Sequence, residues 1–253
     1  MMQFENKTVL VTGGASGIGF LTAKCFAQEG ASVAIVDFDQ KGLDKALGEL
    51  RQVTDRVIGF PVDVRDYAMV EKAAQKTVSE FGSIDILVAC AGGAETRIIQ
   101  GGAFYELPIE VVDWGIDVNL KGALYFDHVA MKQMVKQKSG VIINLGSMTG
   151  VDGAYDALAY SASKSALMNG VVKSLALAGA EFGIRACCVA PGPVLTRPSI
   201  AEAKSLLGGP IQTQEIVDMI LYLASDKAAS MTGSTVLLDR GTTIMHSARA
   251  NRT

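Results

Sequence analysis

The sequence has little charge and no bulk charge of either sign. Charged residues make up 19% of its 253 residues, against roughly 25% in an average soluble domain. The formal net charge is −3, so the chain lacks the positive charge that holds nucleic acid or an anionic membrane surface, and we expect neither as a partner. Because 49% of the residues are hydrophobic, the composition also excludes an intrinsically disordered chain.

Cysteines, histidines and long apolar runs are also few. None of the four cysteines has a CxxC spacing, Cys187 and Cys188 are adjacent, and no His/Asp/Glu cluster occurs, so we expect neither a metal nor a structural disulfide. The N-terminal segment lacks the cationic region and apolar core of a secretory signal. No run reaches the roughly 18 charge-free residues of a membrane span. We therefore expect a soluble, cytoplasmic protein with free thiols.

Short apolar segments alternate with longer helical patterns along the chain. The expected strands are residues 8–11, 32–36, 57–60, 84–89, 140–145, 185–190 and 235–238. The expected helices are residues 18–29, 40–51, 66–81, 109–136, 157–182 and 214–224. Short apolar strands without polar alternation are typical of a parallel sheet covered on both faces. The pattern predicts a Rossmann-like, doubly wound α/β fold. No linker or repeat divides residues 1–253, which predicts a single domain.

A glycine-rich loop, TGGASGIG, follows the first expected strand and opens the first expected helix. Glycines let the backbone approach a pyrophosphate, whose charge is then stabilised by the free N–H groups of the helix N-terminus. The GxxxGxG spacing differs from GxGxxG, and no Lys-Ser/Thr follows as in a P-loop. The candidate cofactor-binding residues of this loop are Gly13, Ser16, Gly17, Ile18 and Gly19.

Asp37 ends the second expected strand. A carboxylate at this place accepts hydrogen bonds from the adenosine ribose and repels a 2′-phosphate, and no Lys or Arg follows within three residues. We therefore expect NAD rather than NADP as the cofactor. A helix N-cap is the alternative role, for which Asp39 competes. Asp63 and Val64, after the third strand, are expected at the adenine edge of the site, although Asp63 also suits a turn.

Tyr160 and Lys164 stand four residues apart in a helical pattern, so their side chains share one face. A neighbouring ammonium stabilises a phenolate, as a tyrosine acting as general acid and base requires. Ser147 ends the fifth strand, at the edge where open α/β sheets bind ligands. A Tyr–Lys pair alone is common by chance. Its position after the glycine loop, Asp37 and Ser147 indicates a catalytic site.

Together these motifs resemble those of the short-chain dehydrogenase/reductase family, over roughly residues 7–241. The resemblance includes TGGASGIG, Asp63-Val64, Ala91-Gly92, Val118-Asn119-Leu120, Ser147, Tyr160-Ser161-Ala162-Ser163-Lys164, Pro191-Gly192 and Thr196.

The resemblance implies a catalytic tetrad of Asn119, Ser147, Tyr160 and Lys164. In this reading Tyr160 exchanges the proton, Ser147 orients the substrate oxygen, Lys164 holds the nicotinamide ribose, and Asn119 sustains a water chain to Lys164. Tyr160 and Lys164 would thereby also contact the cofactor. The resemblance adds further cofactor-binding residues, namely Ala91, Gly92, Pro191, Gly192 and Thr196.

Three positions depart from the family pattern. Ala89-Cys90 stands where two asparagines are frequent, Cys187 where asparagine is usual, and Asp239-Arg240-Gly241 where Asp-Gly-Gly is usual. None of these changes removes a proton-transfer group. We expect Cys90 and Cys187 to be small buried residues rather than reactive thiols.

The leading hypothesis is an NAD-dependent oxidoreductase acting on a small secondary alcohol, a polyol or the corresponding ketone. A 3-oxoacyl-thioester reductase is the alternative among enzymes, and a dinucleotide-sensing protein without turnover is the alternative of another class. Residues 197–212 are expected to cover the substrate, with a helix at residues 200–207. We also expect a homo-oligomer, by resemblance a tetramer, assembled through the two long helical segments.

Overall fold

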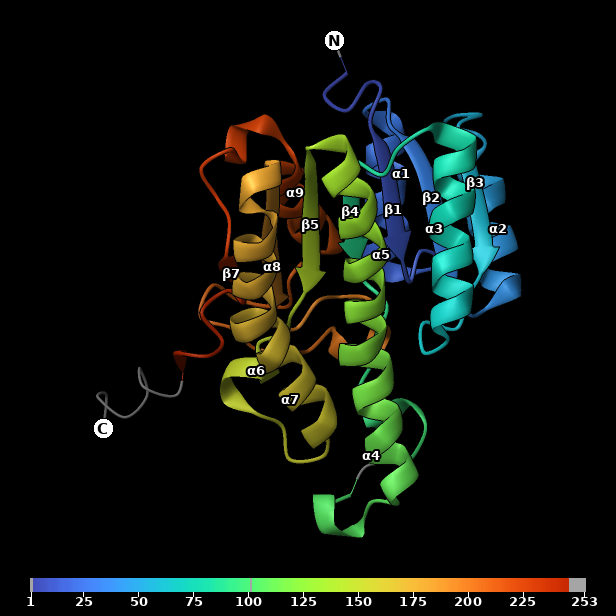
Figure 1. The fold of residues 1–253 in the computed structure, drawn as a ribbon. Helices are drawn as coiled ribbons and strands as arrows, with labels where there is room; N and C mark the ends of the chain where they lie inside the picture. The colour runs from blue at the N-terminus through green and yellow to red at the C-terminus, as the bar shows by residue number, and fades with distance from the viewer. Residues whose placement is uncertain (1, 101, 246–253) are drawn as a thin grey trace.

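The computed structural model describes residues 2–100 and 102–245, and these contain one parallel seven-stranded sheet (Figure 1). Its strand order is β3-β2-β1-β4-β5-β6-β7, which confirms the predicted doubly wound α/β fold. The strands lie within two residues of the expected ranges: β1 (Thr8–Thr12), β2 (Ser32–Asp37), β3 (Val57–Pro61), β4 (Ile86–Ala89), β5 (Gly140–Leu145), β6 (Ile184–Pro191) and β7 (Ser234–Leu238).

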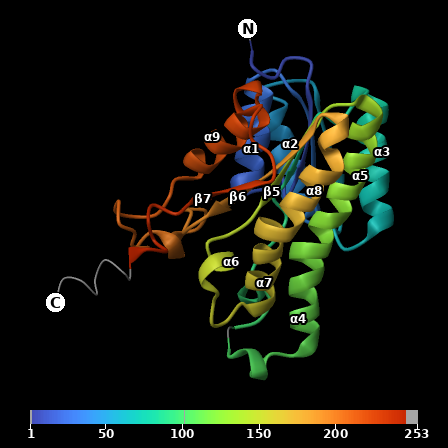
Figure 2. The ribbon, with the colours of Figure 1, turned by 60° about the vertical axis from the view of Figure 1, so that its left-hand side comes forward.

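Helices cover both faces of the sheet (Figures 1 and 2). One face packs against α1 (Gly17–Gln28), α2 (Gln40–Leu50) and α9 (Thr213–Ala224). The other packs against α3 (Tyr67–Phe81), α5 (Gly122–Gln137) and α8 (Val172–Gly179). The strand arrows in Figure 1 point toward the end of the molecule that holds α4 (Ile109–Ile116), α6 (Thr149–Asp152) and α7 (Leu158–Ala166).

Two apolar clusters, one on each face, account for this layering. Val9 and Val11 contribute to one cluster with Phe26, while Leu10 contributes to the other with Phe126. Successive strand residues point to opposite faces, so a strand such as β1, whose three central residues are all apolar, is buried from both sides. This explains the absence of polar alternation in the sequence.

The two long expected helices are each interrupted by a π-helical turn. The turns are Asp117–Lys121, between α4 and α5, and Leu167–Val171, between α7 and α8. A π-turn inserts one extra residue into the helical hydrogen-bond pattern and often occurs at functional sites. The first of these turns contains Asn119, which is fully buried.

The expected helix at residues 200–207 is wrong. The structure has a 3₁₀ turn, Pro198–Ile200, followed by turns and bends. Leu206 packs toward Gly241, whereas the Leu207 side chain is 80% exposed. The apolar residues of this segment therefore do not form a single buried helical face that would hold a helix in place.

Candidate active site

The carboxyl ends of the parallel strands bring the predicted site residues to one edge of the sheet. The strand order changes direction between β1 and β4, the place where open α/β sheets bind dinucleotides. At this place the Ala91 amide, just after β4, donates to Thr12 Oγ1 at the end of β1, at 2.9 Å. Ala91 and the glycine loop are therefore direct neighbours.

The glycine loop is shaped to receive an anion at the N-terminus of α1. A Cβ atom at Gly19 would overlap the Gly13 carbonyl oxygen, so only glycine permits this close approach. Ser16 is the N-cap residue, but its side chain accepts no capping hydrogen bond, which leaves N–H groups of the first turn for an external anion. Thr196, from the loop after β6, lies against Gly17, and Ile18 is half-buried. These residues fit a pyrophosphate.

Asp37 stabilises the glycine loop rather than capping a helix. Its Oδ2 accepts from the Ala15 amide at 3.0 Å, and its Oδ1 accepts from the Asp39 amide at 3.1 Å. The N-cap of α2 is Asp39, which accepts from the Lys41 amide. Of the two roles considered for Asp37, the helix cap is therefore taken by Asp39, and the Asp37 carboxylate lies beside the loop predicted to bind the pyrophosphate.

Asp63 and Val64 lie after β3, as expected. The Arg65 guanidinium donates to Asp63, and this hydrogen bond holds the pKa of the Asp63 carboxyl below its usual range. The Arg65 amide also donates to Asp63 Oδ1 at 3.0 Å, so Asp63 forms a turn as well. Val64 is buried and packs near Gly122. Arg65, to which no sequence motif points, thus orients the carboxylate predicted at the adenine edge.

Asn119 and Lys164 meet at Gly92. A Cβ atom at Gly92 would lie 2.5 Å from Asn119 Oδ1 and 3.4 Å from Lys164 Nζ, so a side chain at this position would displace the Asn119 oxygen and contact the Lys164 ammonium. The Asn119 side chain accepts from the Gly93 amide at 2.9 Å and donates to the carbonyls of Gly93 and Gly115. The π-turn therefore fixes the segment after β4 through Asn119.

Tyr160 and Lys164 lie one turn apart on α7, with Lys164 Nζ 5.5 Å from the centre of the Tyr160 ring. Lys164 is 3% exposed, and its ammonium donates to the Leu145 carbonyl at 2.6 Å. Leu145 is the last residue of β5 and stands two residues before Ser147, whose Oγ accepts from Thr149 Oγ1 at 3.1 Å. The three side chains therefore converge beyond the end of β5.

The predicted residues after β6 border the same edge. The Met148 amide donates to the Pro191 carbonyl at 2.8 Å, and the Gly192 amide donates to the Leu238 carbonyl at 2.8 Å. The first contact joins the loop that contains Ser147 to the end of β6, and the second joins the segment after β6 to the end of β7. The phenol of Tyr160, the ammonium of Lys164 and the hydroxyl of Ser147 thus lie at the same edge of the sheet as the glycine loop, an arrangement that suits proton exchange next to a bound dinucleotide.

Of the three cysteines on β6 and after β4, Cys187 and Cys188 are buried and Cys90 is partly buried. Burial raises the pKa of the Cys188 thiol to about 12, and it also raises the pKa of Cys187. Burial likewise raises the pKa of Cys90 to about 12, although the charge of Lys164 opposes this shift. These thiols are protonated near neutral pH, which agrees with the expectation that Cys90 and Cys187 are not reactive.

Two contacts at the site were not anticipated. Thr149 donates to Ser147, and the buried Glu95 accepts from backbone amides at the start of α7. Thr149 is close to Ser147 in the sequence, so local spacing offered a signal for that contact. Glu95 precedes α7 by more than 60 residues, and no motif pointed to it.

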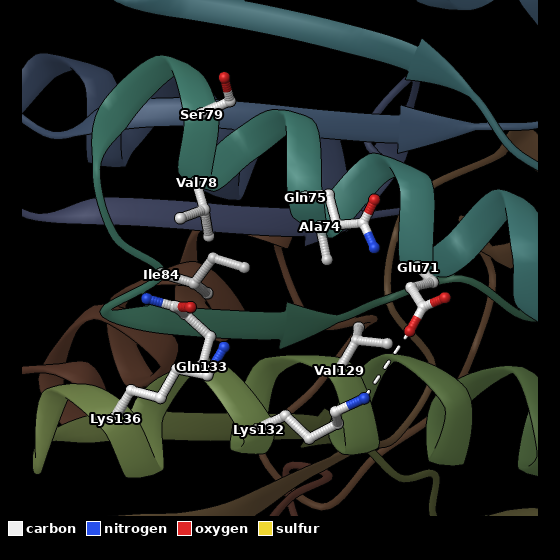
Figure 3. Close-up of a pocket in the computed structure, with 10 residues that line it drawn as sticks. All are labelled: Glu71, Ala74, Gln75, Val78, Ser79, Ile84, Val129, Lys132, Gln133 and Lys136. Atoms are coloured by element: carbon white, nitrogen blue, oxygen red, sulfur yellow. Dashed lines mark ion pairs between the residues drawn. The ribbon is translucent and has the colours of Figure 1, made fainter.

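A groove between α3 and α5 lies outside this site (Figure 3). Glu71 and Lys132 form an ion pair across it at 3.7 Å, and none of the predicted site residues lines it. Within residues 2–100 and 102–245, no group of three or more His, Cys, Asp or Glu side chains is placed to hold a metal ion. In the same part of the chain, no helix combines the length and apolarity needed to cross a bilayer.

Comparisons with known proteins agree with this geometry. The family model for short chain dehydrogenases matches residues 7–205. The chain is 33% identical over 252 residues to the 3-oxoacyl-(acyl-carrier-protein) reductase FabG of Thermotoga maritima, covering 96% of this chain and 100% of that protein. It is likewise 33% identical over 252 residues to the D-threitol dehydrogenase of Mycolicibacterium smegmatis, covering 96% of this chain and 95% of the relative.

The structure is also similar to solved ones. A 7 alpha-hydroxysteroid dehydrogenase complexed with NADH and 7-oxo glycochenodeoxycholic acid has a TM-score of 0.87 at 25% identity, covering 95% of this chain and 96% of that one. The range matched by the family model, residues 7–205, includes the glycine loop, Tyr160, Lys164 and Thr196. The chain therefore belongs to the short-chain dehydrogenase/reductase family and is an oxidoreductase that acts on CH–OH groups.

Proposed function

We propose that the chain is an NAD-dependent oxidoreductase of a secondary alcohol, such as a small alcohol or polyol, with Tyr160 as the general acid and base. The position of Tyr160, Lys164 and Ser147 beyond the end of β5, at the edge of the sheet that also holds the glycine loop, is the observation that carries the proposal. The name of one relative, D-threitol dehydrogenase, supports a polyol as the substrate.

Each residue of the tetrad has a distinct role in this proposal. Tyr160 takes the hydroxyl proton of the alcohol during oxidation and returns it during reduction. Ser147 holds the substrate oxygen beside the phenol, and Thr149 orients Ser147. Lys164 holds the cofactor ribose and stabilises the phenolate form of Tyr160. When bound at the glycine loop, NAD supplies the hydride acceptor.

Asn119 acts on the geometry of the site. Its amide fixes the backbone at Gly93 and Gly115, and the family resemblance adds a water chain to Lys164. The residues proposed to hold the cofactor are those of the glycine loop with Asp37, Asp63, Val64, Ala91, Gly92, Pro191, Gly192 and Thr196.

A 3-oxoacyl-thioester reductase is the alternative, and the similarity to FabG favours it. Against it stands Asp37, whose carboxylate beside the glycine loop opposes the 2′-phosphate of NADPH, the cofactor usual in such reductases. A sensor without turnover is disfavoured because binding alone requires neither Tyr160 nor Lys164.

The test of the proposal is an absorbance assay of NADH and NADPH in both directions. The panel contains polyols, other small secondary alcohols, hydroxysteroids and 3-oxoacyl thioesters. We expect turnover of a secondary alcohol or its ketone with NAD(H). Turnover restricted to 3-oxoacyl thioesters with NADPH would support the alternative, and dinucleotide binding without turnover of any compound would support the sensor.

Asp37 is expected to determine the choice of cofactor. Substitution of Asp37 by serine removes the charge that repels the 2′-phosphate of NADP, and it also removes a carboxylate acceptor for the ribose of NAD. The ratio of kcat/KM for NAD to kcat/KM for NADP should therefore fall by about 10²-fold. Because Asp37 also holds the Ala15 amide, both values can decrease, and the ratio is the informative quantity.

Asp39→Ser is the matched control, since Asp39 caps α2 two residues away. In Asp39→Ser, the ratio of kcat/KM for NAD to kcat/KM for NADP should stay within about twofold of the wild-type ratio. A wild-type preference for NADP, or equal ratios for Asp37→Ser and the wild type, would contradict the role of Asp37.

We also propose a homo-oligomer, with a tetramer favoured by the family resemblance. An apolar groove lies on the outer side of α5, α7 and α8, lined by Leu124, Ala166, Gly170, Val171, Ser174, Leu175 and Ala178. A second copy of the chain is the proposed occupant, because the chain has few charged residues with which to cover its surface.

The expected result is a sedimentation mass that is a multiple of 26.6 kDa. Ala178→Glu places a charge in the groove and should shift the protein to smaller species, because an unpaired buried charge opposes association. A wild-type protein that sediments only as a 26.6 kDa species at micromolar concentration would contradict the oligomer.

A further inference from the structure

Glu95 is a fully buried carboxylate in the loop that follows β4. Its exposed fraction is 0%, which is rare for glutamate unless a partner stabilises the charge. Its Oε2 has no hydrogen-bond partner among the described residues. None of the ion pairs found in residues 2–100 and 102–245 includes Glu95. The charge is therefore stabilised mainly through Oε1.

Glu95 Oε1 accepts from the first turn of α7. The donors are the amide of Ala159, at 2.7 Å, and the amide of Tyr160 itself, at 3.2 Å. The N-cap residue of α7 is Ala157, which has no side-chain acceptor. Glu95 therefore caps α7 from a distant part of the chain, and its negative charge lies at the positive end of the helix.

The same short segment is held by Asn119. Gly93, two residues before Glu95, pairs through both its amide and its carbonyl with the Asn119 side chain. On α4, Gly115 lies against both Glu95 and α7, since a Cβ atom at Gly115 would be 3.3 Å from Glu95 Cδ and 2.7 Å from Ala159 Cβ. Residues 93–95 thus join the π-turn containing Asn119 to the helix turn containing Tyr160.

We propose that Glu95 is a positioning residue that sets the place of Tyr160 relative to Asn119 and Lys164. This inference rests on the proposed role of Tyr160 in proton exchange. Without an acceptor at residue 95, the first turn of α7 loses its cap, and two backbone amides, the buried one of Ala159 and the partly buried one of Tyr160, lose their partner. The phenol then shifts from its reacting position, whereas the glycine loop is unchanged.

The test compares two neutral side chains of similar length. Glu95→Gln keeps an oxygen that can accept from the Ala159 and Tyr160 amides, whereas Glu95→Met fills the same space without that acceptor. We expect Glu95→Met to lower kcat by about 10–100-fold, because small displacements of reacting groups have effects of this size. Glu95→Gln should restore kcat to within about fivefold of the wild type. The KM for the alcohol and the Kd for NADH should change by less than about threefold in both.

A second variant and a control complete the experiment. Glu95→Asp keeps the carboxylate but is one methylene too short to reach both amides, so its kcat should be lower than that of Glu95→Gln. If Glu95→Met does not fold, the comparison of Glu95→Asp with Glu95→Gln decides the test. Glu106→Met is the control, because Glu106 caps the Ala103 amide in the same loop but is exposed. The kcat of Glu106→Met should stay within about twofold of the wild-type value.

The inference would be overturned if Glu95→Met and Glu95→Asp kept the kcat of Glu95→Gln. It would also be overturned if NADH binding fell in parallel with kcat, since that result indicates a general loss of structure. Tyr160→Phe, assayed with the same substrate, separates this inference from the proposed function. If Tyr160→Phe retains turnover, the proposed function fails. If it is inactive while the Glu95 variants are fully active, only the role of Glu95 is refuted.

Discussion

Replacement of Tyr160 by phenylalanine is expected to lower kcat by about 10³-fold or more, since general acid–base catalysis contributes about 10²–10⁴-fold. Phenylalanine keeps the ring that Lys164 Nζ approaches at 5.5 Å but has no proton to exchange. The backbone amide that donates to Glu95 also remains. The Kd for NADH should therefore change by no more than about threefold, and the loss should appear in kcat.

Steady-state turnover and the quenching of protein fluorescence by NADH measure these two quantities. Tyr222→Phe, on α9 and away from the predicted site, is the control and should behave as the wild type. A Tyr160→Phe enzyme with kcat within tenfold of the wild type would exclude Tyr160 as the proton donor. Loss of NADH binding together with turnover would instead assign Tyr160 to binding.

The second large effect is expected at Asp127, a buried residue of α5. Burial raises the pKa of the Asp127 carboxyl to about 7, although a hydrogen bond from Asn144 Nδ2, at 3.0 Å, opposes the shift. Asp127 Oδ1 and Asn144 Oδ1 both lack partners within the described residues. A protonated Asp127 offers a donor to this pair, whereas an ionised one leaves two buried acceptors unpartnered.

The sign of the pH dependence follows from the raised pKa. The folded protein binds a proton more tightly at Asp127 than the unfolded chain does, so the free energy of unfolding decreases as pH rises from the usual carboxyl pKa to about 7. Below this window the carboxyl is protonated in both states, and above it the full cost of the buried charge is present. The wild type should lose about 2–3 kcal/mol between pH 5 and pH 8 from this group alone.

Asp127→Asn should remove that loss. The asparagine amide can donate to the unpartnered Asn144 Oδ1 and accept from Asn144 Nδ2, so the variant should be more stable than the wild type at pH 8, by a larger margin than at pH 5. Urea unfolding at both pH values, at one protein concentration, measures the difference. Asp113→Asn, at an exposed position of α4, is the control. Equal pH slopes for the wild type and Asp127→Asn would contradict the account.

Much of the fold could be predicted because the local patterns and the tertiary structure agree. Residues 140–145 form β5 as expected, Asp37 is the last residue of β2, and the glycine loop and Ser147 each follow a strand. All seven strands are parallel, so their carboxyl ends lie at one edge of the sheet. Residues that end or follow a strand are therefore expected at that edge from their position in the sequence alone.

Other features depend on contacts that local patterns do not encode. The π-turn at Asp117–Lys121 looks like continuous helix in the sequence, because one inserted residue hardly changes the apolar periodicity. The residues that flank Glu95 and Asp127 in the sequence form no pattern that predicts burial of a carboxyl group. Both side chains are buried only by the packing of the folded chain. The helix expected at residues 200–207 does not form, because Leu206 and Leu207 are exposed and the apolar residues of the segment share no buried face.

A crystal structure of the protein with NADH and an unreactive analogue of its alcohol substrate tests the central claim most directly. The analogue oxygen should lie about 2.6–3.2 Å from Tyr160 Oη, with its carbinol carbon about 3–3.5 Å from the nicotinamide carbon that carries the hydride. A nicotinamide ring bound far from Tyr160, with the analogue contacting neither Tyr160 nor Ser147, would contradict the claim.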